Sequence, residues 1–149
     1  MSQNAPDFTL PGTEGDVTLS ALRPAPVVLF FYPRDNTSGC TTEAQDFTAL
    51  LPEFEAAGVK VFGISKDDMA SHARFVEKKA LGMPLLSDAD GTTCEDFGVW
   101  QEKKMYGKTF MGIVRSTFQI DGSGQIVREW RKVKVAGHAA EVLDAARAL

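Results

Sequence analysis

Cysteine and histidine are both scarce in this chain of 149 residues, which has two of each. Two cysteines are too few for a disulfide-rich secreted scaffold or for a four-cysteine zinc site. The two histidines, His72 and His138, lie far apart in the sequence and outside any HExxH pattern. We therefore expect both to be core or solvated residues, and we predict no metal site.

Long apolar runs and an excess of positive charge are also absent. The longest apolar run, Val27–Tyr32, is far shorter than the ~20 residues of a membrane helix. The 16 basic and 20 acidic residues give a net charge of −4, without the basic field that nucleic acid or an anionic membrane would need. The polar segment before residue 11 has no signal-peptide pattern. We therefore expect a cytoplasmic protein that binds neither nucleic acid nor membranes.

The chain also lacks internal repeats, low-complexity segments and breaks in composition. Hydrophobic residues make up 44% and charged residues 24%, as in an average soluble domain. A length of 149 residues fits one domain with one substantial core. The sequence therefore predicts a single domain over residues 1–149.

Apolar periodicity predicts alternating strands and helices. Extended segments are expected at residues 7–10, 17–19, 27–32, 59–65, 85–86, 116–120 and 126–130. Helices are expected from residue 40 or 41 to 57, and at 68–80, 93–97 and 139–148. The polar, glycine-containing segment 101–112 is expected to be a loop, of which Met105–Met111 borders the pocket. A β-α-β unit followed by a β-β-α unit indicates an α/β, thioredoxin-like fold: a central mixed sheet flanked by helices, with an N-terminal β extension.

Cys40 lies where a buried strand and a polar loop give way to a helix. A helix N-terminus presents free N–H groups and partial positive charge, which favour a reactive thiolate. Thr37 could hydrogen-bond the sulfur or a bound oxygen, and the rigid Pro33 could shape and partly dry the pocket. The alternative is a packing cysteine, because free cysteine is often buried. A dithiol reductase is disfavoured, since Glu43 replaces the second cysteine of a Cys-x-x-Cys pattern.

The segment 31–44, FYPRDNTSGCTTEA, closely resembles the Pro-x-x-x-Thr-x-x-Cys signature of peroxiredoxins. In detail it looks like the bacterioferritin-comigratory, or Q-type, branch of that family. Ser38 is a departure, because the branch often has proline there. The resemblance covers nearly the whole chain, with further matches at residues 5–10, 63–65, 86–88, 97–100, 102–103 and 112–118.

This resemblance implies a thiol peroxidase that reduces hydrogen peroxide and organic hydroperoxides. The Cys40 thiolate would attack one peroxide oxygen and become a sulfenic acid. Thr37, Arg115 and backbone N–H groups near Gly39 and Cys40 would stabilise the leaving oxygen. Because sulfur carries the redox change, no cofactor is implied. Electrons would come from thioredoxin or another small thiol system, and a monomer is expected because many Q-type relatives are monomers.

The resemblance also assigns the surroundings of Cys40. Arg115 falls on the active-site arginine of the family, although on residue type alone it would be a surface ion-pair partner. Tyr32, Gly39 and Trp100 are expected near the pocket, with Trp100 packing rather than reacting. Glu43 either hydrogen-bonds within the site or favours the helix N-terminus.

The thiol that regenerates Cys40 is left open by the sequence. The Q-type family often has a resolving cysteine five residues after the first or in the following helix, where this chain has Gln45 and Val76. We favour attack by an external thiol, with Cys94 as a packing residue. The alternatives are a Cys40–Cys94 disulfide, which requires Cα atoms within about 7 Å or local unfolding, and a redox sensor in which Cys40 is only a switch.

Overall fold

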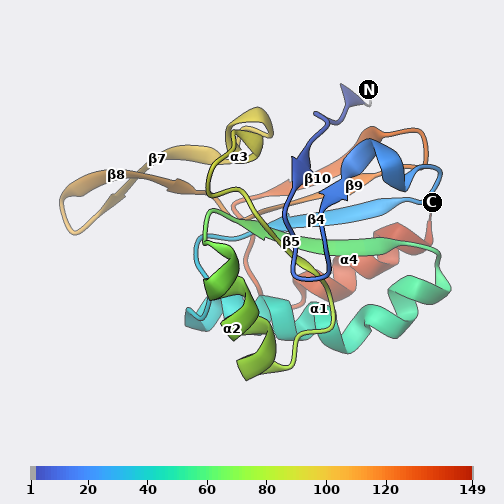
Figure 1. Ribbon diagram of the computed structural model, residues 1–149, viewed down its shortest axis with the longest axis horizontal. Coiled ribbons are helices and arrows are strands. Elements are labelled where there is room, and N and C mark those ends of the chain that lie inside the picture. The colour runs from blue at the N-terminus through green and yellow to red at the C-terminus, as the bar shows by residue number, and fades with distance from the viewer. Residues whose placement is uncertain (1–2, 149) are drawn as a thin grey trace.

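The computed structural model describes residues 3–148 and is built on a six-stranded mixed sheet, in the order β1-β10-β9-β4-β5-β6 (Figure 1). Its strands are β1 (Gln3–Asn4), β4 (Val27–Phe31), β5 (Lys60–Ser65), β6 (Leu85–Ser87), β9 (Ser116–Ile120) and β10 (Gln125–Arg131). The central strand β4 pairs in parallel with β5 and antiparallel with β9. The predicted mixed sheet is confirmed.

Helices cover both faces of this sheet, as predicted. They are α1 (Ser38–Ala56), α2 (Met69–Lys79), α3 (Thr93–Asp96) and α4 (His138–Arg147). Figure 1 shows α1, α2 and α4 on one side of the sheet and the short α3 on the other. None of the helices within residues 3–148 is long and apolar enough to cross a membrane.

Strand β4 is buried on both faces, because its alternate side chains enter two different cores. One core holds Val27, Leu29 and Phe31, and the other holds Val28 and Phe30. A continuous apolar run, rather than an alternating one, is what such a doubly covered strand requires. The two cores are thereby separated by the sheet itself.

The N-terminal segment forms the predicted β extension. A two-stranded sheet joins β2 (Thr9–Leu10) to β3 (Val17–Thr18), and a short 3₁₀ helix, η1 (Leu19–Leu22), follows. Strand β1 pairs antiparallel with β10 and so belongs to the main sheet.

The prediction of a loop over residues 101–112 is wrong. This segment forms a hairpin of β7 (Trp100–Met105) and β8 (Lys108–Ile113) that projects from the body (Figure 1). Tyr106 and Gly107 make its two-residue turn, both with positive φ (53° and 75°), as this tight turn requires. Because much of the hairpin is solvated on both faces, its strands lack the polar–apolar alternation that would reveal them.

Removal of the Phe47 ring should destabilise the fold strongly. Phe47 of α1 is fully buried and stacks on Phe30 of β4, with ring centroids 4.7 Å apart. We expect Phe47→Ala to lower the free energy of unfolding by about 3–5 kcal/mol, because the cavity cannot collapse between a helix and a sheet. Urea denaturation measures this, with the exposed Gln45→Ala on the same helix as control, expected within about 0.5 kcal/mol of wild type. Equal losses in both variants would contradict the prediction.

Candidate active site

Cys40 lies in the first turn of α1, which begins at Ser38, two residues before the predicted start. Thr37 is the N-cap residue, and the first helical hydrogen bond runs from the Thr41 N–H to the Thr37 carbonyl. The Cys40 side chain is only 1% exposed. The thiol is therefore both shielded from bulk solvent and close to the unpaired N–H groups of a helix N-terminus.

Arg115 joins this turn from a distant part of the chain, the link between β8 and β9. Its Nη2 donates a hydrogen bond to the Cys40 Sγ at 3.2 Å, and its Nη1 donates to the Glu43 Oε1 at 2.7 Å. The planar guanidinium suits two parallel contacts, which a lysine ammonium could not reproduce. A fixed positive charge is thus held against the sulfur.

Glu43, one helical turn after Cys40, is buried beside it. Its Oε1 is paired with Arg115, whereas its Oε2 has no hydrogen-bond partner among the described residues. Burial raises the pKa of Glu43 to about 7, and this effect outweighs the opposing charge of Arg115. Of the two roles left open above, the structure places Glu43 within the site, as a carboxyl that changes protonation near neutral pH.

Gly39 allows Arg115 to approach this turn. A Cβ atom built on Gly39 would lie 3.2 Å from the Arg115 Nη2, closer than an ordinary van der Waals contact. A larger residue would push the guanidinium away from the sulfur. Gly39 thus lies beside the Arg115 guanidinium, and its place in the peroxide pocket stays a prediction.

Comparison with known proteins bears directly on this arrangement. The AhpC/TSA family model matches residues 1–129 of the chain. Peroxiredoxin Bcp of Xanthomonas campestris is 54% identical over 122 residues, which cover 82% of this chain and 76% of that protein. Peroxiredoxin Bcp of Bacillus subtilis is 46% identical over 145 residues, covering 97% and 92%. The chain belongs to the AhpC/TSA family of peroxiredoxins.

Solved structures agree with this assignment. Peroxiredoxin Q of Xanthomonas campestris superposes with a TM-score of 0.90 at 50% identity, covering 95% of this chain and 90% of that one. A PrxQ variant of Xylella fastidiosa gives 0.91 at 40% identity, covering 99% and 97%. The predicted thioredoxin-like fold and Q-type resemblance are confirmed. As a peroxiredoxin, the chain is a thiol peroxidase that acts on hydroperoxides and draws electrons from a thiol.

Several residues predicted near the site of this peroxiredoxin make their hydrogen bonds and ring contacts with groups other than the Cys40 sulfur. The Thr37 hydroxyl donates to the Arg34 carbonyl at 3.0 Å, and Pro33 is exposed. Trp100 is half-buried against the core on the opposite face of the sheet from Cys40, with the Lys66 ammonium 5.0 Å from its ring centroid. Trp100 therefore packs, as expected, and does not line the thiol.

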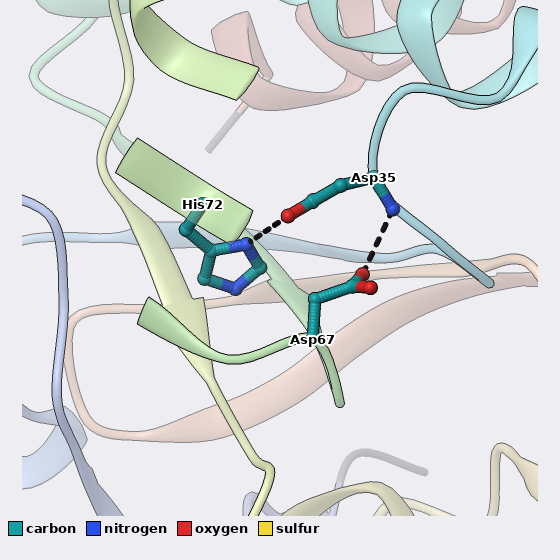
Figure 2. Close-up of side chains that lie close together, drawn as sticks. All are labelled: Asp35, Asp67 and His72. Atoms are coloured by element: carbon teal, nitrogen blue, oxygen red, sulfur yellow. Dashed lines mark hydrogen bonds and ion pairs between the residues drawn. The ribbon is translucent and has the colours of Figure 1, made fainter. Parts of the chain in front are cut away.

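The Tyr32 hydroxyl donates its hydrogen bond to Asp35 Oδ1, at 2.6 Å, and not to the sulfur. Asp35 in turn belongs to a group with Asp67 and His72 whose ligand atoms lie within 4.8 Å of one another (Figure 2). Within residues 3–148 it is the one group of this kind. Its side chains are already engaged, His72 Nδ1 with Asp35 Oδ2, and Asp67 Oδ2 with the Asp35 backbone N–H. His72 is thus a core residue, as predicted, in an ion pair that the sequence did not reveal.

Lys103, on β7, is a site neighbour that sequence reasoning missed. It is half-buried, unlike the strand residues beside it. Burial and the charge of Arg115 lower the pKa of Lys103, while Cys40 opposes this change. The ammonium therefore shares the electrostatic environment of the thiol. The register of the hairpin that brings it there was not visible in the sequence.

Cys94 lies on the other face of the sheet from Cys40. Cys94 packs with Leu29 and Phe31, whereas Cys40 packs with Phe30 and Tyr32. Burial and the nearby Asp88 carboxylate raise the pKa of the Cys94 thiol far above its ordinary value, and its backbone N–H donates to Asp88 Oδ2 at 2.8 Å. Since the thiolate is the nucleophile, this environment disfavours the reactive form of Cys94.

The raised pKa of Glu43 should be visible in the stability of the protein. Between its ordinary pKa of 4.5 and its folded value of about 7, the folded state binds the extra proton, so stability falls as pH rises through that window. We expect Glu43→Gln to remove up to about 3 kcal/mol of this decline, because glutamine does not titrate. Urea denaturation midpoints of wild type and Glu43→Gln, measured from about pH 4.5 to 8, test this. The difference between the two curves isolates Glu43, because the other titratable groups are the same in both proteins. Parallel curves would show the expectation to be wrong.

Proposed function

We propose that this peroxiredoxin reduces hydrogen peroxide and organic hydroperoxides at Cys40, with Arg115 as its main electrostatic partner. The observation that carries this proposal is the 3.2 Å contact between Arg115 Nη2 and Cys40 Sγ at the first turn of α1. A cation and helix N–H groups beside a shielded sulfur favour the thiolate and stabilise negative charge on the departing oxygen. Thr37 and Pro33 are proposed to complete the peroxide pocket from the preceding loop.

The oxidation step is a displacement at the O–O bond. The Cys40 thiolate forms an S–O bond with one peroxide oxygen, the O–O bond breaks, and its electron pair leaves on the other oxygen. That oxygen takes up a proton and departs as water or an alcohol. Sulfur is thereby oxidised by two electrons to a sulfenic acid, and the peroxide is reduced by two.

We further propose that an external thiol, from thioredoxin or a small thiol, resolves this sulfenic acid. Its sulfur attacks Cys40, forming a mixed disulfide and releasing water; a second thiol then frees Cys40 as a thiol and leaves a disulfide in the reductant. Support comes from Gln45 and Val76, which occupy the usual resolving positions, and from Cys94, which lies across the sheet with a protonated thiol.

The protein is also proposed to act as a single-domain monomer in the cytoplasm. Both cysteines are free thiols in the structure, which suits a reducing compartment. The hairpin exposes Met105, Tyr106, Phe110 and Met111, and these are the residues at which self-association would be expected to begin. Size-exclusion chromatography of wild type tests the monomer, and elution as a dimer would overturn it. Tyr106→Ser then shows whether the hairpin turn makes the dimer contact.

Replacement of Arg115 tests the electrostatic role directly. We expect Arg115→Lys to slow the reaction with hydrogen peroxide about a hundredfold, because one ammonium cannot hold both Cys40 and Glu43. Stopped-flow measurement of the second-order rate constant decides it, with the exposed Arg128→Lys on β10 as control. Cys40→Ser should abolish the reaction. An unchanged rate in Arg115→Lys would remove Arg115 from the mechanism.

Replacement of Cys94 tests the resolving step. We expect Cys94→Ser and Cys94→Ala to keep multiple turnovers with thioredoxin or a small thiol, because an external thiol does the work. Intact-mass analysis after one equivalent of peroxide should show the gain of one oxygen in wild type and both variants. A loss of two hydrogens in wild type alone would instead indicate a Cys40–Cys94 disulfide. Oxidation without repeated turnover under excess reductant would favour the redox sensor.

A further inference from the structure

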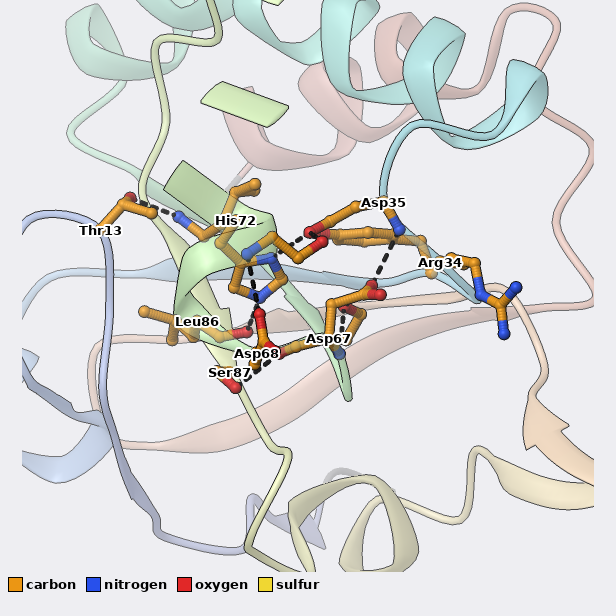
Figure 3. Close-up of polar contacts among 12 residues, drawn as sticks. Thr13, Arg34, Asp35, Asp67, Asp68, His72, Leu86 and Ser87 are labelled. Atoms are coloured by element: carbon orange, nitrogen blue, oxygen red, sulfur yellow. Dashed lines mark hydrogen bonds and ion pairs between the residues drawn. The ribbon is translucent and has the colours of Figure 1, made fainter. Parts of the chain in front are cut away.

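The loop that precedes Cys40, residues 33–37, is held by a buried polar network centred on Asp35. The Asp35 Oδ2 accepts hydrogen bonds from His72 Nδ1 at 2.7 Å and from Ser71 Oγ at 2.8 Å. The Tyr32 hydroxyl donates to the other oxygen, Oδ1. The Asp35 backbone N–H donates to Asp67 Oδ2 at 2.8 Å. Figure 3 shows the network drawing together the loop, the start of α2 and the ends of β5 and β6.

His72 acts in this network as a doubly donating side chain. Its Nδ1 faces the Asp35 carboxylate, and its Nε2 lies 2.9 Å from the Leu86 carbonyl oxygen. Both neighbours are acceptors, so both contacts are made only when each ring nitrogen carries a proton. His72 and Asp35 are both buried, and a buried ion pair of this kind is strongly sensitive to the loss of either partner.

The network bears on two conflicting needs of the reaction. Reaction with peroxide requires the Cys40 sulfur to be in contact with Arg115, at the first turn of α1. An external thiol must then reach the same sulfur, which is only 1% exposed. That turn therefore has to move between the two half-reactions, and Asp35, five residues before Cys40, tethers the loop from which the turn starts.

We propose that the His72–Asp35 pair is a latch that holds the Cys40 turn closed for peroxide and sets how readily it opens to the reductant. This inference rests on the proposed function of Cys40. Asp35 and His72 are positioning residues in it, because neither touches the sulfur. Loss of the latch should slow oxidation of Cys40 and expose its turn.

The charges around His72 make the stability of the latch depend on pH. Asp35 faces it from the loop and Asp67 from the segment before α2. The Tyr32 ring faces it from just after β4, and the Leu86 carbonyl from β6. Asp35, together with Asp67 and Leu86, raises the pKa of His72 against the effect of burial. A neutral imidazole loses one of its two contacts, so the latch holds at low pH and loosens as pH rises through the folded pKa of His72.

The test compares His72→Gln and Asp35→Asn with wild type in two measurements. The rate of Cys40 oxidation by hydrogen peroxide, followed by quenched-flow mass spectrometry, should fall roughly ten- to a hundredfold, because the thiol loses its position. Hydrogen exchange of residues 36–44 should become faster. Across pH, wild type should show an alkaline decline in the oxidation rate, separate from any effect of Glu43, and this decline should be absent in His72→Gln.

Asp68→Ala is the matched control. Asp68 caps the same helix, accepting from the Ser71 N–H at 2.8 Å, but does not contact Asp35. It should leave both measurements near wild type. Ser71→Ala, which removes a single bond to Asp35, should shift both in the direction of His72→Gln but less, and it decides the matter if the other variants do not fold.

Wild-type rates and exchange in folded His72→Gln, or equal effects in Asp68→Ala, would overturn the latch. If wild type itself fails to consume peroxide, the proposed function fails instead. The exchange measurement then still reports whether the His72–Asp35 pair holds the turn. The two failures are therefore distinguishable.

Discussion

The contact of the Arg115 guanidinium with Cys40 and Glu43 is the interaction on which the site depends. It joins the first turn of α1 to the link between β8 and β9, which are separated by more than 70 residues in the chain. Gly39 leaves room for it, and Glu43 supplies a buried counter-charge. Burial raises the pKa of Glu43, whereas the charge of Arg115 lowers it. The site therefore combines a permanent cation, Arg115, with a carboxyl group whose protonation depends on pH.

The sheet gives this contact its setting. Strand β4 carries one core on each face, so the two cysteines of the chain lie in different environments, with different chemistry. Cys40 faces a cation at a helix N-terminus, whereas Cys94 faces apolar side chains and a carboxylate. The surroundings of Cys40 therefore favour a thiolate and those of Cys94 a neutral packing thiol, because burial and neighbouring charge decide how readily a thiol ionises.

Much of the fold was predictable because it depends on local signals. Neighbouring residues alone predict the strand over Val27–Tyr32, the loop before Cys40 and the helix that follows. The hairpin of β7 and β8 was predicted wrongly as a loop, since solvated strands carry no apolar alternation. Lys103 and the His72–Asp35 pair were missed for a related reason: whether a charged side chain is buried, and against what, is decided by segments far away in the chain.

The sequence by itself determined the family and the fold and indicated Cys40 as the candidate reactive thiol, because a short motif and a continuous apolar strand carry that information locally. Only the tertiary structure decided that Glu43 hydrogen-bonds to Arg115, that Cys94 lies across the sheet, and that His72 hydrogen-bonds to Asp35 in the loop before Cys40. These contacts join residues that are far apart in the chain and are brought together by the sheet and helices. A buried charge cannot be recognised in the sequence until its partner in the fold is known.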